Sequence, residues 1–408
     1  MMRIYGNESE TLPPIVLMQT QDGNYWPPIG ELKITIEFDV ESLVPPSLYA
    51  KFVHCSVDWK ENENVFLNDI VNSRTSNIMW ESAPMYSKYF TWRGKIKVPS
   101  EQVKFQFAGN WKVKLYEYYK DSVPFAEGRF FVVNPKTECN IQIYTNFYEP
   151  VHQVSGTALD FEAIVTGSQQ LFESHLNTVV IYRNNRFEEP FIITKNDDLQ
   201  LNKNQYRYKY RTAIGGFVSG GKRFRIEGIP AENEYRVLDL TDMASYPRIT
   251  APVRFPMSDL RRNGTWFDED DDGAMITRFI TSSNDDYVYL EFLFNPDGWI
   301  SDEEVFVVGS FNNWKPDASW QMYYDPDERV YKLRHWVRRA RHNYLYATGK
   351  YNIDSRVVES ISYEEYEGNT ATSGHTYIAL VYYREFDYGG YDALIGVGAS
   401  TIRGFIRR

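Results

Sequence analysis

The side chains of this sequence that could carry out catalysis are its six histidines, two cysteines and many carboxylates. No pair of histidines has the HxH or HExxH spacing of a zinc site, and no GxSxG segment supplies a serine nucleophile. Cys55 and Cys139 lie in no recognised catalytic context. The carboxylates are read as solvated surface charges, because paired acid and base chemistry needs a geometry that spacing alone does not supply. We therefore predict no catalytic residue, no metal and no cofactor.

Two segments come close to known ligand loops. Residues 216–223, GFVSGGKR, have the G-x-x-x-x-G-K spacing of a phosphate loop, but Arg223 stands where a Ser or Thr should bind magnesium. The sequence FRIEGI that follows alternates like a strand and does not open a helix, so we predict a tight turn between strands. Residues 268–273, DEDDDG, resemble half of a calcium loop, but Phe279 replaces its bidentate glutamate. A plain acidic loop is expected there, with weak calcium binding as the alternative.

Tryptophans and arginines towards the C-terminus are the candidates for binding. The segment VFVVGSFNNWKP (305–316) resembles the opening strand and turn of early-set immunoglobulin-like domains, which include glycogen- and starch-binding modules. In such modules exposed tryptophans stack on sugar rings, as Trp314 and Trp320 could do here. The same turn also occurs without a sugar, with its tryptophan packed against the sheet.

A basic and aromatic segment, 334–342, interleaves arginines and histidines with one tryptophan. Such a cluster in an acidic chain could contact lipid headgroups or an acidic partner, while the alternative is a strand and turn with a solvated cationic face. The candidate contacts to a partner or ligand are Trp314, Trp320, Trp336, Arg338, Arg339 and Arg341.

Length, charge and cysteine content limit the class of protein. A chain of 408 residues is too long for one hydrophobic core, so two or three domains are expected. The net charge of −11 argues against nucleic acid as the main partner. No stretch is long and apolar enough to span a bilayer as a helix, and MMRIYGNESE contains no signal-peptide core. Cys55 and Cys139 are expected to be free buried thiols, although one bridge between them stays open.

Hydrophobic alternation predicts an all-β protein. In residues 32–40 the apolar side chains alternate with Lys33, Thr35, Glu37 and Asp39, which indicates a strand with one buried and one solvated face. Aromatic residues make up 16% of the chain and favour strands. Further short strands are expected at 113–119, 129–133, 140–144, 206–211, 288–294, 305–311 and 377–383. Helix signals are few, at 65–71 and 168–176. This pattern predicts tandem immunoglobulin-like β-sandwich domains with few short helices.

Three domains are expected from the strand ends. The segment VNPKTE (133–138) closes the first unit, and the polar, acidic stretch 258–286 precedes the last. The predicted domains are an N-terminal sandwich at 1–135, a second sandwich at 136–273 and an early-set immunoglobulin-like sandwich at 274–408.

Several segments, in order along nearly the whole chain, resemble one family, the plug protein of the type IX secretion system of Bacteroidota. The most specific is the closing pattern at 364–398, with a Gly-Asn turn, a Tyr-Tyr-Arg strand end and a final Asp-x-Leu-Ile-Gly. The other segments are HCSVDWKENE (54–63), FAGNWKVKLYE (107–117), GRFFVV (128–133), HQVSGTALDFE (152–162), NEYRVLDL (233–240) and DDYVYLEFLF (285–294).

The resemblance implies a non-enzymatic protein of the periplasm, attached peripherally to the outer membrane. Such a protein docks at the periplasmic mouth of the translocon barrel and closes it, without spanning the membrane and as a monomer when free. An export signal would then have to precede Met1. The main alternative is a carbohydrate-binding protein that uses its third domain. A glycoside hydrolase with sandwich accessory units is a weaker one, because the chain has no catalytic barrel pattern.

Overall fold

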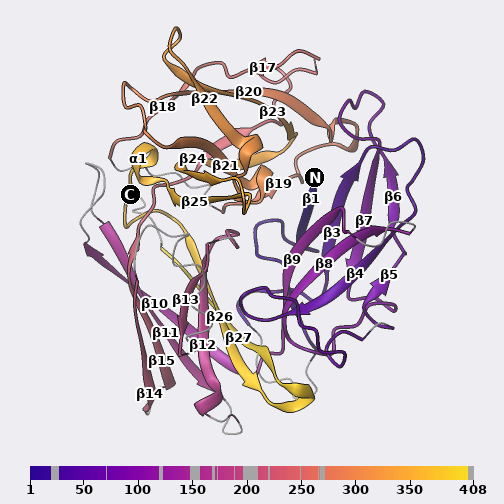
Figure 1. The fold of residues 1–408 in the computed structure, drawn as a ribbon, viewed down its shortest axis with the longest axis vertical. Helices are drawn as coiled ribbons and strands as arrows, with labels where there is room; N and C mark the ends of the chain where they lie inside the picture. The colour runs from indigo at the N-terminus through magenta and orange to yellow at the C-terminus, as the bar shows by residue number, and fades with distance from the viewer. Residues whose placement is uncertain are drawn as a thin grey trace.

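Strands dominate the structure, a computed structural model, which confirms the all-β prediction. It describes residues 1–19, 27–69, 71–118, 123–147, 157–167, 171, 173–187, 189–195, 210–218, 221–248, 250–264, 266 and 272–402. The strands form three sandwich-like units, and in Figure 1 the orange third unit lies across the ends of the other two.

The first unit packs two sheets around an apolar core, and their strands are antiparallel except for β2, which pairs with β9 in parallel. One sheet has the order β1-β3-β7-β6: β1 (Met2–Gly6), β3 (Ile34–Val40), β7 (Trp92–Val98) and β6 (Met79–Ser82). The other has the order β2-β9-β8-β4-β5: β2 (Ile15–Leu17), β9 (Ala126–Val133), β8 (Gly109–Glu117), β4 (Leu48–Cys55) and β5 (Arg74–Thr75). Phe38, Phe52, Trp111 and Phe130 fill the space between the sheets. The inward half of each alternating strand supplies this core, as the sequence predicted.

The second unit closes with strands from the end of the chain. Its first sheet has the order β10-β11-β15-β14: β10 (Thr137–Phe147), β11 (Thr157–Gly167), β15 (Gly221–Pro230) and β14 (Arg211–Val218). Its second has the order β13-β12-β26-β27: β13 (Phe191–Thr194), β12 (Leu176–Arg183), β26 (Thr376–Glu385) and β27 (Tyr391–Thr401). Val218 of β14 pairs with Gly221 of β15, so the glycine-rich segment 216–223 contributes to two paired strands. The two residues expected to form the tight turn, Ser219 and Gly220, lie outside the described residues.

The third unit folds one ten-stranded sheet into two layers, joined through the pairing of β21 with β22. One layer holds β16 (Arg236–Asp239), β19 (Met275–Ile276), β21 (Glu304–Gly309), β24 (Arg341–Asn352) and β25 (Val357–Ser362). The other holds β17 (Val253–Arg254), β18 (Asp259–Leu260), β20 (Tyr287–Asn295), β22 (Gln321–Asp325) and β23 (Val330–Arg338). Phe292, Phe311 and Trp320 are among the residues of its core.

The described helical segments are each about one turn long. They are α1 (Glu364–Glu367) and the 3-10 segments η1 (Glu173–His175), η3 (Ser282–Asn284), η4 (Ser310–Asn312), η5 (Ala318–Trp320) and η6 (Asp387–Gly389). The predicted helix at 65–71 is a turn in its described residues, and the one at 168–176 is reduced to η1 where it is described. The predicted strand 206–211 lies outside the described residues except for Tyr210 and Arg211.

The sheets divide the chain at points that differ from the contiguous domains expected from the sequence. Strands β26 and β27 pair with β12 of the second unit, although 274–408 was expected to be one domain. Strand β16, expected in the second unit, pairs with β24 of the third. The reason is that β12 is buried at the centre of its sheet and needs a neighbour on each side, which the chain supplies only by returning at its end.

The first two units share an apolar boundary. Side chains on the outer face of β2 and β9 pack against those of β12, β26 and β27, and Phe131, Tyr182, Leu380 and Leu394 are all almost fully buried there. The Tyr382 hydroxyl donates a hydrogen bond of 2.6 Å to the side-chain oxygen of Asn110 across the same boundary. The two units therefore form one body with a continuous core.

We expect Leu380→Ala to lower the free energy of unfolding by about 2–5 kcal/mol, because it removes buried methyl groups and leaves a cavity between the two units. Urea unfolding monitored by tryptophan fluorescence measures the change. The control Leu43→Ala, at a fully exposed leucine, should change it by about 0.5 kcal/mol or less. Equal effects of the two substitutions would contradict the role of this boundary.

Candidate functional site

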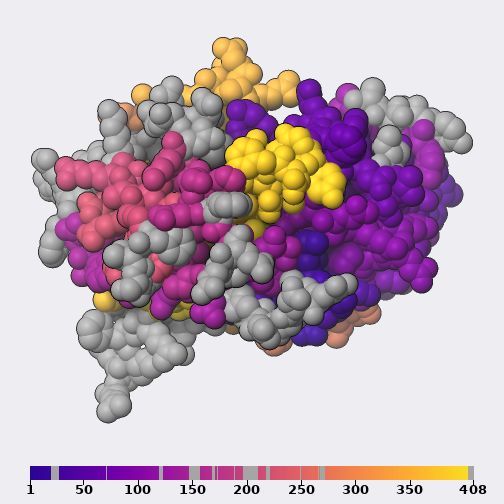
Figure 2. All heavy atoms as spheres, turned by 90° about the horizontal axis from the view of Figure 1, so that it is seen from below, coloured from indigo at the N-terminus to yellow at the C-terminus, as the bar shows by residue number. Residues whose placement is uncertain are grey.

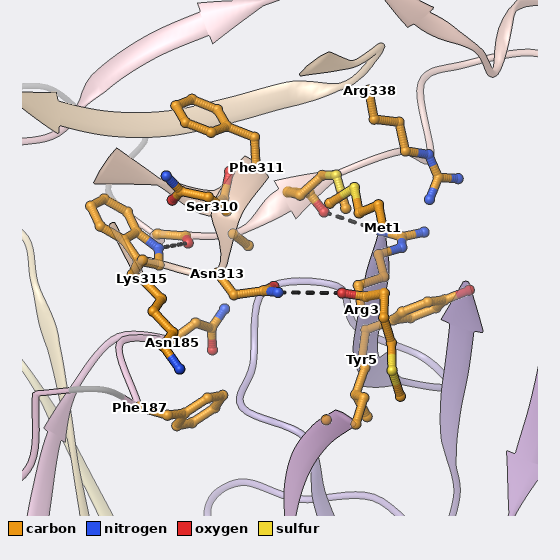
Figure 3. A pocket seen from close by; sticks show the side chains of 18 of the residues that line it. Met1, Arg3, Tyr5, Asn185, Phe187, Ser310, Phe311, Asn313, Lys315 and Arg338 are labelled. Atoms are coloured by element: carbon orange, nitrogen blue, oxygen red, sulfur yellow. Dashed lines mark hydrogen bonds between the residues drawn. The ribbon is translucent and has the colours of Figure 1, made fainter. Parts of the chain in front are cut away.

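A cavity of about 470 Å³ lies where the three units meet. Its walls come from Arg3 and Tyr5 of β1, from Asn185 and Phe187 after β12, and from the segment 310–315 after β21 (Figure 3). Strand β23 adds its own side chains to the wall. Of the six candidate contact residues, Trp314, Trp320, Trp336 and Arg338 line this cavity, whereas Arg339 and Arg341 do not.

Trp314 is a structural part of its turn. Its side chain is only 1% exposed, and its indole Nε1 donates a hydrogen bond of 2.8 Å to the carbonyl of Gly273. Asn313 and Trp314 both adopt positive φ angles, 54° and 58°, and the Trp314 amide bonds the Gly309 carbonyl at 2.9 Å. The ring packs on Tyr235 at 4.6 Å between centroids. It therefore leaves no free face for a sugar.

Trp320 is buried in the same way. Its ring lies between His335, at a centroid distance of 3.9 Å, and Phe311, at 4.8 Å, and it is 6% exposed. Of the two readings of Trp314 and Trp320, stacking on sugar rings and packing within the fold, the structure agrees with packing, because both side chains are buried in the third unit and at its boundary.

The basic segment 334–342 is split between two faces of β23. Alternation places Arg334, Trp336 and Arg338 on the outer face of the sheet, where Arg338 is covered by the first unit and is 2% exposed. Arg339 points the other way, is 1% exposed and donates to the carbonyl of Leu240 at 2.7 Å. The sequence predicted for this segment either a solvated cationic face or a site that an anionic partner could reach. Both predictions are wrong for Arg338 and Arg339, because the two side chains are buried.

Trp336 and Arg341 are half-buried. The ring of Trp336 stacks on Tyr289 at 5.0 Å and contacts Tyr89 of the first unit at 5.7 Å. Arg341 begins β24, paired with Asp239 and Ile276. A partner contact at either residue stays a prediction.

Glu37 of β3 binds arginines from two units. Its carboxylate accepts a hydrogen bond of 2.8 Å from Arg3 Nε and another from Arg338, and the residue is 3% exposed. Burial by itself would raise the pKa of Glu37, but the guanidinium groups of Arg338, Arg3 and Arg93 hold it well below its usual range. The sequence predicted a solvated face of β3 at Thr35, Glu37 and Asp39. This is wrong, because all three side chains are buried, and Arg338 and Tyr287 of the third unit bond Glu37 and Asp39.

The network continues through Asp285, which links two units. Its carboxylate bonds Arg338 at 2.8 and 2.9 Å and also pairs with Arg93 of β7. Arg93 in turn donates a hydrogen bond of 2.6 Å to Asp39. Asp39 also accepts a hydrogen bond of 2.7 Å from the Tyr287 hydroxyl of the third unit. Each carboxylate therefore has arginine or tyrosine donors from both sides of the boundary.

A second charged cluster joins the second and third units. Arg186 is fully buried between the rings of Trp314 and Tyr363, at 5.2 and 4.5 Å from their centroids, and pairs with Glu189 and Glu232. Burial alone would raise the pKa of Glu232, but Arg183 and Arg186 lower it to about 2. This arginine, held by two carboxylates and two rings, fixes the third unit against the second.

Several buried titratable side chains are held in their neutral form at pH 7. The buried histidines His54, His342 and His375 have pKa values lowered to about 4, first by burial, so they are neutral at pH 7. Burial raises the pKa of both thiols, Cys55 and Cys139, to about 12, and both are free, as the sequence predicted. No group of three or more His, Cys, Asp or Glu that could hold a metal ion occurs within the described residues. Most of the DEDDDG segment lies outside them.

Sequence reasoning missed Glu37, Arg3, Arg93 and Arg186. Their neighbours in the chain are ordinary strand and loop residues, and each of the four also contacts a residue of the third unit, far away in the sequence. The one local signal was the basic segment that contains Arg338.

We expect Arg338→Met to lower the free energy of unfolding by about 3–5 kcal/mol, because it leaves the Glu37 and Asp285 carboxylates buried with fewer partners. Urea unfolding measures this. Arg334→Met, two residues away on the same strand, is the matched control: Arg334 is exposed, and Arg254 stays 3.8 Å from its partner Glu291. The control should change stability by about 1 kcal/mol or less. Similar losses for both variants would contradict a special role for the buried network.

Stability should fall as the pH drops from 6.5 towards 4. His342 Nε2 donates a hydrogen bond of 2.8 Å to the carbonyl oxygen of Arg338, and its Nδ1 lies 3.0 Å from Ser310 Oγ. Burial lowers the pKa of His342 to about 4. The unfolded chain therefore binds a proton in this range while the native one does not. In His342→Gln the slope of unfolding free energy against pH should be shallower by up to about 1.4 kcal/mol per pH unit. Urea titrations at pH 4.5 to 8 test this, and unchanged slopes would contradict it.

Taken together, the fold and this junction define a multi-unit β-sandwich protein whose buried charges hold its units together. Residues 13–134 match the family model described as the type 9 secretion system plug protein 1st domain, a span that runs from β2 through β9. This match confirms the resemblance of the sequence to the type IX secretion system plug family and supports a role in type IX secretion.

Among solved structures, the whole chain is similar to a hypothetical protein from Parabacteroides merdae ATCC 43184. The TM-score is 0.74 at 19% identity, over 98% of this chain and 96% of that one, which shows a shared fold. A complex of Dpr2 Ig1-Ig2 with DIP-Theta Ig1-Ig3 aligns at a TM-score of 0.18 and 12% identity, over 55% of this chain and 86% of that one, which is too low to indicate a shared fold. No curated protein matches the sequence. In the described part of the chain, no helix is long and apolar enough to cross a membrane.

Proposed function

We propose that this protein is a non-enzymatic plug of the type IX secretion translocon. In this proposal it binds the periplasmic mouth of the outer-membrane barrel and closes it, as a monomer when free. The observation that supports it most directly is the match of residues 13–134 to the first domain of plug proteins. The same family implies a periplasmic location near the outer membrane.

The construction of the molecule supports this role physically. A pore wide enough for folded cargo leaks unless a body of comparable size covers it. The three units are joined by one apolar boundary and two buried charged clusters, so they cannot move apart without exposing apolar surface or unpaired charges. A rigid body keeps its shape against a rim and loses little conformational entropy on docking.

The carbohydrate alternative loses its main support. It depended on Trp314 and Trp320, and both rings are covered by neighbouring side chains. An affinity gel containing soluble glucan would show no retardation of the protein if this conclusion holds.

Deletion of the gene in its host should make the outer membrane leakier to large solutes without abolishing secretion. Uptake of a large antibiotic or fluorescent dextran measures the leak, and an affinity-tagged copy of the protein should restore the barrier and co-purify a very large outer-membrane barrel. Unchanged permeability together with no co-purifying barrel would overturn the proposal.

A further inference from the structure

An exposed apolar patch lies where the first two units meet, far from the charged junction. It consists of Val65, Phe66, Phe386 and Tyr388, which are 76%, 64%, 67% and 57% exposed. We refer to these four residues as the tip patch. Figure 2 shows the yellow turn between β26 and β27 protruding between the magenta second unit and the purple first unit. Exposed apolar side chains gathered in this way are typical of interaction sites.

The turn that carries Phe386 and Tyr388 has an unusual backbone. Tyr388, Gly389 and Gly390 all have positive φ angles, 53°, 84° and 88°. For tyrosine this conformation costs roughly 1–2 kcal/mol, since its Cβ crowds the backbone. The side-chain amide of Asn64 donates to the Tyr388 carbonyl, and the Tyr388 ring contacts Phe107 at 5.1 Å. The first unit thus holds a strained, solvent-facing tyrosine in place, which is a feature found at binding sites.

The patch is rigid because it sits on a rigid boundary. Phe386 rests on His175 of the second unit at a ring distance of 4.5 Å, while Tyr388 rests on the first unit. The two units are joined by the apolar cluster that contains Leu380 and Tyr382. The loops that form the tip patch therefore keep their relative positions, and a partner would meet a preorganised surface.

The charges around the patch restrict its partner. Glu63 and Asp387 are both exposed, and neither forms an ion pair within the described residues. Two neighbouring cations are neutralised, Arg384 by Asp392 at 3.0 Å and Lys136 by Glu385 at 3.6 Å. The carboxylates of Glu63 and Asp387 therefore make this part of the rim acidic, in a chain of net charge −11.

An acidic rim disfavours three of the possible partners. A second copy would bring like charges together, and anionic bilayers and nucleic acid would be repelled. A protein surface with an apolar pocket and a basic rim complements both the aromatic side chains and the carboxylates.

We propose that the tip patch is the surface with which this chain docks on an apolar, basic-rimmed surface of the translocon barrel. This inference rests on the proposed function. Phe386 and Tyr388 insert into the apolar surface of the barrel, while Glu63 and Asp387 face its cations. The charged junction at the other side of the body holds the third unit and does not contact the barrel.

The test compares two double variants in binding to the purified barrel. Phe386→Ser with Tyr388→Ser should weaken binding by about tenfold or more, measured by biolayer interferometry. Phe279→Ser with Tyr323→Ser is the matched control, because those residues are 61% and 55% exposed on the third unit, and it should bind within about twofold of the wild type. Equal melting temperatures of the variants confirm that both fold. Asp387→Lys should also weaken binding, increasingly so at low salt.

The outcomes separate the two proposals. If the wild-type protein does not bind the barrel, the proposed function fails. If the wild type binds and the tip-patch variant binds equally well, the docking surface is wrong while the function stands. If the wild type instead floats with phosphatidylglycerol vesicles, or forms dimers on size exclusion that the tip-patch variant loses, then a bilayer or a second copy occupies the patch and the proposal is overturned.

Discussion

The structure depends on a buried carboxylate that only two units together can satisfy. Glu37 lies in the first unit, and its charge is balanced by Arg3 from that unit and by Arg338 from the third. Ionised groups that are removed from water need such partners, because their hydration is lost and little else replaces it. The third unit must therefore place Arg338 against β3, and Asp285 against Arg93, in one relative orientation. Arg186, between Trp314 and Tyr363, fixes the same unit from the other side.

The boundaries thus differ in kind. The first two units adhere through apolar side chains, which tolerate some change of shape but give a large driving force. The third unit is held by charged and cation–π contacts, which add less net stability but demand one geometry. The first two units therefore share one apolar core, and the third unit is held against them in one orientation by the charged contacts (Figure 1).

The cavity at the charged junction and the tip patch lie on different parts of the molecule and differ in how far their side chains are already bonded. The cavity at the junction is lined by residues that already bond one another, such as Asn313 to Met2 and Trp314 to Gly273 (Figure 3). The tip patch, by contrast, presents large apolar side chains to solvent at the boundary of the first two units. If the protein acts by binding a large partner, exposed aromatic side chains in a fixed arrangement contribute more to affinity than side chains that are already bonded within the protein.

The sequence alone determined the strands, the free thiols and the resemblance that the match of 13–134 confirmed, because alternation and motifs are recorded locally in the chain. It misjudged the polar face of β3, where Glu37 is buried, and the basic segment, where Arg338 and Arg339 are buried. It also gave no sign that β26 and β27 return to the second unit. Only the tertiary structure decided these points, since a polar face is solvated or buried according to what another unit lays over it, and strand pairing across nearly two hundred residues leaves no trace in local periodicity.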